Sequence, residues 1–175
     1  MDRNFFAVTF VAEDRPGIVA EVTKILFDNG FNIEDSSSTL LRGIFSMILI
    51  ISRKEDCNTD FIEDIFSSLK YMTTSVKRVE RDFTPFNGDS YSISVYGADK
   101  AGIVYKVSKF FADKGINILD LQTKVAGKEG KPIYIMVMEV AVPEDVRSGW
   151  LDELKLLSRE VGVDINAKSI ETFEF

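Results

Sequence analysis

The chain reads Asp14-Arg15-Pro16-Gly17-Ile18-Val19 and, 85 residues later, Asp99-Lys100-Ala101-Gly102-Ile103-Val104. A second motif, Gly30-Phe31-Asn32-Ile33, returns at the same spacing as Gly115-Ile116-Asn117-Ile118. Between residues 14 and 35, 11 of 22 positions are identical to the positions 85 residues further along. Chance at ordinary residue usage would give about one or two identities. The 175 residues are therefore two copies of one module, and function must come from one site built twice or from the seam between the copies.

Composition narrows the classes of function. The net charge of -7 argues against a nucleic-acid partner, because neutralising phosphates requires clustered lysine and arginine. The chain has no histidine, which excludes Ser-His-Asp triads, Cys-His pairs and His-ligated metals. It has no apolar run of about 18 residues that would span a membrane and no secretory signal pattern. Cys57 is the single cysteine, which fits a reducing cytoplasm.

The first copy, residues 1–83, has the periodicity of a βαββαβ unit. Residues 5–11 form a continuous β-favouring run typical of a central strand. Ile18, Val22, Ile25 and Leu26 make one stripe of an amphipathic helix. The remaining predicted elements are strands over 31–41 and 44–51, a helix over 59–72 and a strand over 75–81.

The second copy, residues 90–175, repeats this order after a linker at 84–89. Its predicted strands cover 91–97, 116–125, 133–142 and 163–170. One helix carries Ile103, Val107, Phe110 and Phe111, and the other is striped by Val146, Trp150, Leu154, Leu157 and Val161. We therefore expect an α+β protein of two tandem ferredoxin-like βαββαβ modules, each an antiparallel sheet with both helices on one face.

The turn before the first helix is the first candidate binding feature. Asp14 is predicted to cap the helix, Pro16 fixes φ, and Gly17 allows a positive φ. The helix start would then offer unpaired N–H groups and a partial positive charge to a small carboxylate. Taken alone, such a pattern is more often a well-made turn than a ligand site.

Asn32 and Asn117 are the second candidate feature. Each opens the second strand of its copy, where an amide can hydrogen-bond a ligand, although an asparagine that caps a local turn is the commoner case. The turn and the asparagine recur together in both copies. We expect the two features to lie at the same end of the sheet and to hold one small amino acid.

Together these motifs resemble the signature of the ACT domain, a small-molecule-binding regulatory module. The resemblance covers almost the whole chain, and the paired layout is most similar to the glycine cleavage system transcriptional repressor group. It implies amino-acid ligands held by the turn backbone and the asparagine, usually at an interface between two modules. The residues it marks are Asp14, Arg15, Pro16, Gly17, Ile18, Asn32 and Ile33 in the first copy, and Asp99, Lys100, Ala101, Gly102, Ile103, Asn117 and Ile118 in the second. Ala101 departs from the pattern because it replaces proline, so the second turn is expected to be less rigid.

We therefore expect a cytoplasmic, non-enzymatic, amino-acid-binding regulatory protein. It would act on transcription or on an enzyme through a protein partner, with no cofactor, metal, membrane or direct nucleic-acid contact, and a homodimer is one assembly open to it. Two alternatives remain. The chain can be a structural or dimerisation module without a ligand, or a small enzyme that uses Asp14 or Asp99 as an acid or base.

Overall fold

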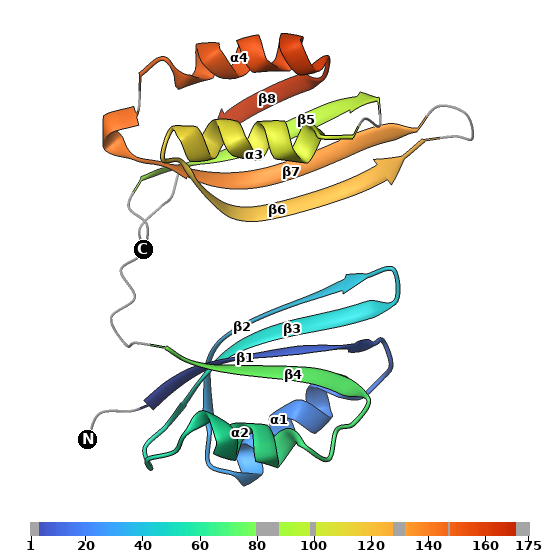
Figure 1. The fold of residues 1–175 in the computed structure, drawn as a ribbon, viewed down its shortest axis with the longest axis vertical. Helices are drawn as coiled ribbons and strands as arrows, with labels where there is room; N and C mark the ends of the chain where they lie inside the picture. Colours follow the sequence, from blue (N-terminus) through green and yellow to red (C-terminus); the bar gives the residue numbers. More distant parts are fainter. Residues whose placement is uncertain (1–3, 80–87, 99–100, 128–131, 147, 171–175) are drawn as a thin grey trace. The chain divides into compact units, whose positions relative to one another are not determined.

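The computed structural model describes residues 4–79, 88–98, 101–127, 132–146 and 148–170, in two compact units, Met1–Phe83 and Thr84–Phe175 (Figure 1). We call them unit 1 and unit 2 and describe each by itself. Of the expected linker at 84–89, residues 84–87 lie outside the described residues, and Asp89 already belongs to a strand.

Unit 1 has the predicted βαββαβ order. Its elements are β1 (Asn4–Glu13), α1 (Ile18–Asp28), β2 (Asn32–Leu41), β3 (Ile44–Arg53), α2 (Thr59–Phe66) and β4 (Met72–Val79). The strands form one antiparallel sheet in the order β2-β3-β1-β4, which places the β-favouring run of β1 in the interior as predicted. Both helices cover the same face of this sheet (Figure 1).

Unit 2 repeats that architecture. Its elements are β5 (Asp89–Ala98), α3 (Ile103–Asp113), β6 (Asn117–Ala126), β7 (Ile133–Val142), the 3-10 turn η1 (Glu144–Val146), α4 (Trp150–Val161) and β8 (Asp164–Ser169). The sheet order is β6-β7-β5-β8, again antiparallel, with both helices on one face (Figure 1). Even the irregularity of the edge strand is repeated, between Ile33 and Asp35 in β2 and between Ile118 and Asp120 in β6.

Each core lies between the sheet and its helices. In β1 the alternate residues Phe6, Val8 and Phe10 are fully buried, and α1 answers them with Val22 and Leu26. Burying a side chain of this size contributes about 1.5–3 kcal/mol, so the period-2 strand and the 3.6-period helix are held by the same contacts. Among the described residues, no helix combines the length and apolar character needed to cross a membrane.

Two predicted helix boundaries are wrong. Helix α2 ends at Phe66 rather than at residue 72. Leu69 and Met72 keep the expected spacing and face the core, but they do so from successive turns and from the start of β4. In unit 2, Val146 lies in η1 and not on α4, because Gly149 has a φ of +85° and interrupts the helix before Trp150. Apolar spacing alone does not distinguish a helix from consecutive turns that pack on the same core.

Candidate functional site

The turn between β1 and α1 leaves the helix without a side-chain cap. Gly17 is the N-cap residue with a φ of +97°, as its predicted left-handed role requires, and no side chain of the described residues accepts from its helix start. The prediction that Asp14 caps the helix is therefore wrong. Its backbone N–H instead donates to the carbonyl of Gly43 at 2.8 Å. The N–H groups of the first helical turn remain available to a ligand.

The tip of the β2–β3 hairpin forms the other wall of this region. Arg42 and Gly43 both have positive φ, 48° and 84°, as a two-residue hairpin turn that follows the sheet twist requires. Because the Gly43 carbonyl holds the Asp14 amide, the start of β3 lies beside the turn. A pocket of about 470 Å³ results, which we call the turn pocket; it is lined by Asp14, Arg15, Gly17, Ile18, Val19, Ala20 and Phe45.

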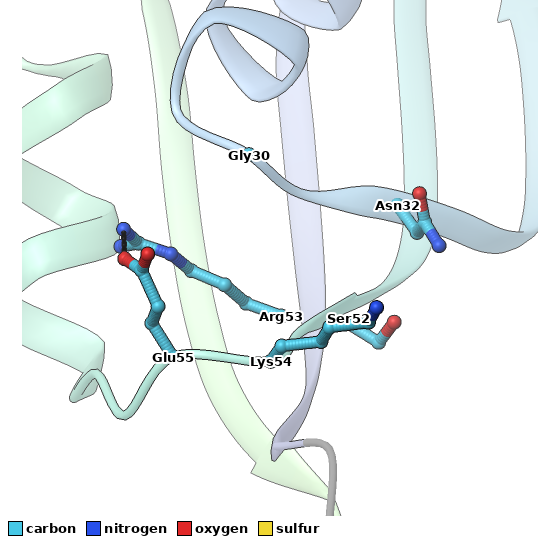
Figure 2. Close-up of a pocket in the computed structure, with 6 residues that line it drawn as sticks. All are labelled: Gly30, Asn32, Ser52, Arg53, Lys54 and Glu55. Carbon is cyan, nitrogen blue, oxygen red and sulfur yellow. Dashed lines mark hydrogen bonds and ion pairs between the residues drawn. The ribbon is translucent and has the colours of Figure 1, made fainter.

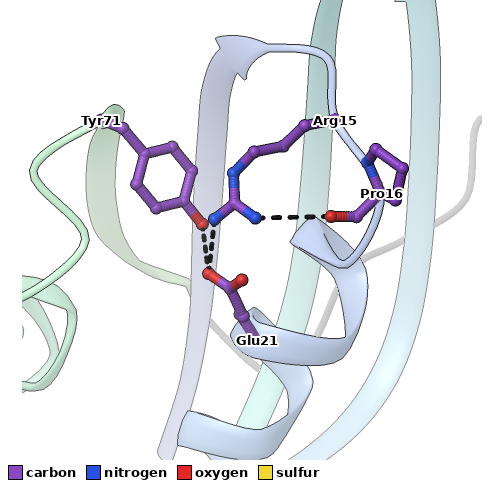
Figure 3. Close-up of polar contacts among 4 residues, drawn as sticks. All are labelled: Arg15, Pro16, Glu21 and Tyr71. Carbon is purple, nitrogen blue, oxygen red and sulfur yellow. Dashed lines mark hydrogen bonds and ion pairs between the residues drawn. The ribbon is translucent and has the colours of Figure 1, made fainter.

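Arg15 takes part in a polar cluster that joins three segments of unit 1 (Figure 3). Its Nη2 lies 2.7 Å from Oε2 of Glu21 on α1, and its Nη1 donates to the Pro16 carbonyl at 3.3 Å. Tyr71, just before β4, donates its hydroxyl to the same Glu21 oxygen at 2.7 Å and places its ring 4.2 Å from the Arg15 guanidinium carbon. The Arg15 hydrogen bond, reinforced by that of Tyr71, lowers the pKa of Glu21. Burial and the Glu21 hydrogen bond raise the pKa of Tyr71.

Asn32 does not lie near this turn within unit 1. Strand β1 pairs with β3 from Asn4↔Arg53 to Glu13↔Ile44, and β2 pairs with β3 from Asn32↔Ser52 to Leu41↔Ile44. The start of β2 is therefore level with the start of β1, whereas the turn follows the end of β1. A ten-residue strand spans roughly 30 Å, so the prediction that turn and asparagine share one end of the sheet is wrong.

Asn32 instead borders a second pocket, of about 350 Å³, which we call the β2 pocket (Figure 2). It is lined by Gly30, Asn32, Ser52, Arg53, Lys54 and Glu55. Arg53 is not free in this pocket, because it forms an ion pair with Glu55 and stacks over the rings of Phe31 and Phe61 at 5.5 and 5.0 Å. The exposed Asn32 amide and the exposed Lys54 are the polar groups best placed to meet a ligand there.

Unit 2 repeats the helix start but not its surroundings. Gly102 is the N-cap of α3 with a φ of +91°, again without a side-chain cap, and Ile103 is buried like Ile18. Ala101 and Asn117 are exposed, whereas the predicted site residues Asp99 and Lys100 lie outside the described residues. The strand register aligns Ser52 and Arg53 with Ala141 and Val142, so unit 2 lacks the polar lining of the β2 pocket.

The sequence pattern did not reveal Glu21, Tyr71 or Phe45 as neighbours of the turn. Glu21 offered one signal, since it is replaced by Lys106 at the 85-residue spacing. Tyr71 offered none, because its place beside Arg15 depends on the end of α2, 56 residues away in the chain.

Possible catalytic or metal chemistry has little to build on among the described residues. They contain no group of three or more acidic or cysteine side chains arranged to hold a metal ion. Cys57 packs against the core, and burial raises the pKa of its thiol.

Comparison with known proteins gives a consistent family. Residues 4–74 and residues 91–155 each match a family model of the ACT domain. UPF0237 proteins from Methanopyrus kandleri and Methanococcus maripaludis are 44% identical over 48 residues and 43% identical over 56 residues, or 27% and 32% of this chain. These matches span 53% and 61% of the relatives' own lengths. A UPF0237 protein of Streptococcus pneumoniae is 33% identical over 61 residues, which is 35% of this chain and 69% of that protein.

Two solved structures are similar over nearly the whole chain. The crystal structure of an unknown protein from Galdieria sulphuraria is 28% identical with a TM-score of 0.84, and the match covers 97% of this chain and all of that one. A candidate glycine cleavage system transcriptional repressor is 21% identical with a TM-score of 0.69, over 98% of this chain and all of that one. At this identity the second likeness shows the fold alone.

Proposed function

Because the chain belongs to the ACT domain family, as two ACT domains in tandem, we propose that it is a non-enzymatic regulatory protein that binds a small amino acid. The observation that carries the proposal is the turn pocket of unit 1, which combines an uncapped helix start, a carboxylate and an apolar wall.

The turn pocket has the groups that a zwitterion needs. The N–H groups at the start of α1 would take the ligand's α-carboxylate, where they and the helix dipole favour an anion. The Asp14 carboxylate would accept hydrogen bonds from the ligand's α-ammonium group. Phe45, Val19 and Ala20 would pack against the ligand's side chain. We propose a second site of the same kind in unit 2, formed by Asp99, Lys100, Ala101, Gly102 and Ile103.

Asn32 has a different place in this proposal. One small ligand cannot contact both the turn and Asn32 of the same unit, because the two lie at opposite ends of the sheet. A ligand that uses both must take them from two copies of the module. We propose that a homodimer supplies the second copy, so that Asn32 and Ile33 of one chain complete a turn site on another chain. Asn117 and Ile118 would have the same role for unit 2.

Ligand binding would regulate by shifting the population of two arrangements, one of which exposes a surface for a protein partner. We propose transcription as the regulated process, as the name of the structurally similar glycine cleavage repressor suggests. A protein partner would contact the DNA, since the net charge of -7 opposes direct binding by this chain.

Thermal unfolding and calorimetry with each of the twenty amino acids test this proposal. A ligand at 100 times its Kd should stabilise the native state by about 2.7 kcal/mol. Asp14→Asn should weaken binding by roughly tenfold or more, as expected for loss of a charged hydrogen-bond partner. Asp28→Asn is the matched control, because Asp28 is an exposed carboxylate at the other end of α1, paired with Lys24. If no amino acid stabilises the protein, the chain is better described as a dimerisation module without a ligand.

A mixture of variants tests the shared site. Asn32→Ala should weaken binding by about 1–3 kcal/mol, the cost of leaving a ligand group unpaired. When Asp14→Asn and Asn32→Ala chains are mixed, a mixed dimer contains one turn and one asparagine that are both intact. Mixing should therefore restore part of the tight binding, whereas no recovery would contradict a site shared between chains.

A further inference from the structure

We propose that Glu21 and Tyr71 sequester the Arg15 guanidinium and thereby restrict the turn pocket of unit 1 to amino acids with neutral, apolar side chains. This inference rests on the proposed function, because it concerns which amino acids the same pocket accepts.

Arg15 lies where it could select for an acidic ligand. It lines the turn pocket, and its Nη1 is 4.0 Å from the position that a Cβ on Gly17 would occupy, at the start of α1. A free guanidinium there would present several N–H donors to the side-chain carboxylate of aspartate or glutamate. The pocket would then favour dicarboxylic amino acids.

The cluster removes that possibility. Glu21 accepts from Nη2 at 2.7 Å, the Pro16 carbonyl accepts from Nη1 at 3.3 Å, and the Tyr71 ring covers the guanidinium at 4.2 Å. Glu21 is itself fixed by the Tyr71 hydroxyl at 2.7 Å. Because Glu21 belongs to the same chain, it competes with any ligand carboxylate at a high effective concentration.

The rest of the lining favours the same choice of ligand. Once Arg15 is occupied, the charged group of the pocket that stays uncompensated by this cluster is the Asp14 carboxylate, which would repel a second carboxylate on the ligand. Ile18, Val19, Ala20 and Phe45 supply apolar surface. An aliphatic side chain therefore fits this pocket better than an acidic one.

Unit 2 cannot build the same cluster from the equivalent positions. Lys106 stands at the position of Glu21 and lies 3.5 Å from the Glu160 carboxylate. The register of β4 on β1 and of β8 on β5 aligns Tyr71 with Gly162, which has no ring and no hydroxyl. The selectivity proposed here belongs to unit 1, and Lys106 provides a matched control position.

The test is a gain of binding by Glu21→Gln. Calorimetry with L-leucine, L-valine, L-aspartate and L-glutamate is run on the full chain and its variants. The wild-type protein should prefer leucine or valine. Glu21→Gln should raise the affinity for glutamate relative to leucine by roughly tenfold or more, because the released guanidinium gains a charged partner. Tyr71→Phe should shift the same ratio in the same direction by less, since the ring remains and only the hydroxyl bond to Glu21 is lost.

Two further variants separate selectivity from folding. Lys106→Gln should leave the ratio unchanged, and adding Arg15→Gln to Glu21→Gln should abolish the gain. The inference is overturned if Glu21→Gln and Tyr71→Phe are folded and bind leucine like the wild type, yet gain no affinity for glutamate. A wild-type protein that prefers glutamate would also overturn it. If the wild-type protein binds none of the twenty amino acids, it is the proposed function itself that fails.

Discussion

Units 1 and 2 share a scaffold but differ around the turn that opens their first helices. Gly17 and Gly102 have nearly the same φ, 97° and 91°, and the ion pairs Lys24–Asp28 and Lys109–Asp113 occupy the same positions on α1 and α3. Unit 1 adds the Arg15–Glu21–Tyr71 cluster, which unit 2 cannot form. The backbone geometry that creates a binding site can thus be repeated while the side chains that tune it are changed independently.

The largest expected effect tests whether the two cores are equally essential. Phe10→Ala in unit 1 and Trp150→Ala in unit 2 should each lower the free energy of unfolding of their unit by about 3–5 kcal/mol. Phe10 is fully buried against Phe66 with ring centroids 4.8 Å apart, and Trp150 contacts Tyr91 at 5.0 Å. Denaturant unfolding followed by circular dichroism measures both variants. Phe27→Ala is the control, because Phe27 is 81% exposed and its loss should change the free energy little.

The next effect should be equal in the two units. Gly17→Ala and Gly102→Ala each force a side chain into the left-handed region, which costs about 1–2 kcal/mol. An added Cβ would meet no backbone atom within 4 Å at either position, so the conformation alone should decide the cost. Unfolding free energies that differ by much more than 1 kcal/mol between the two variants would show that the turns are not equivalent.

A smaller effect should appear in unit 1 alone and depend on pH. The pKa of Glu21 is lowered in the folded state, mainly by the Arg15 hydrogen bond. Its contribution to stability is therefore present above the pKa of an unfolded glutamate, about 4.3, and is lost as pH falls through the lower folded pKa. The Tm of the wild type should slightly exceed that of Glu21→Gln at pH 7, and the difference should vanish near pH 3. A difference that grew with acid would contradict the cluster.

The smallest effect concerns the reactivity of Cys57. Burial raises the pKa of this thiol, although Arg53 and Arg78 act in the opposite direction. Its reaction with a thiol reagent should therefore be slow at pH 7 and accelerate only above the pH range in which an exposed cysteine becomes reactive. Stopped-flow measurement against a small free thiol provides the reference, and a faster reaction than that reference at pH 7 would show an activated cysteine.

The fold could be predicted from the sequence because its signals are local and occur twice. The alternation in β1 and the stripe of α1 each report burial directly, and the repeat doubles the evidence. The end of α2 could not be predicted, since Leu69 and Met72 keep a helical spacing while belonging to turns and a strand. Asn32 was misplaced for a topological reason. Two parallel strands joined by a helix start at the same end of the sheet, so the end of β1 and the start of β2 are far apart.

The most direct test of the amino-acid site is the response of the backbone amides at the start of α1. Titration of the isotope-labelled full chain with L-leucine, followed by two-dimensional NMR, should shift the amide resonances of Ile18, Val19 and Ala20 with one common Kd. The same titration of Asp14→Asn should show weaker binding at these amides. Saturating binding seen by calorimetry without a shift at Ile18, Val19 or Ala20 would contradict a carboxylate held by the start of α1.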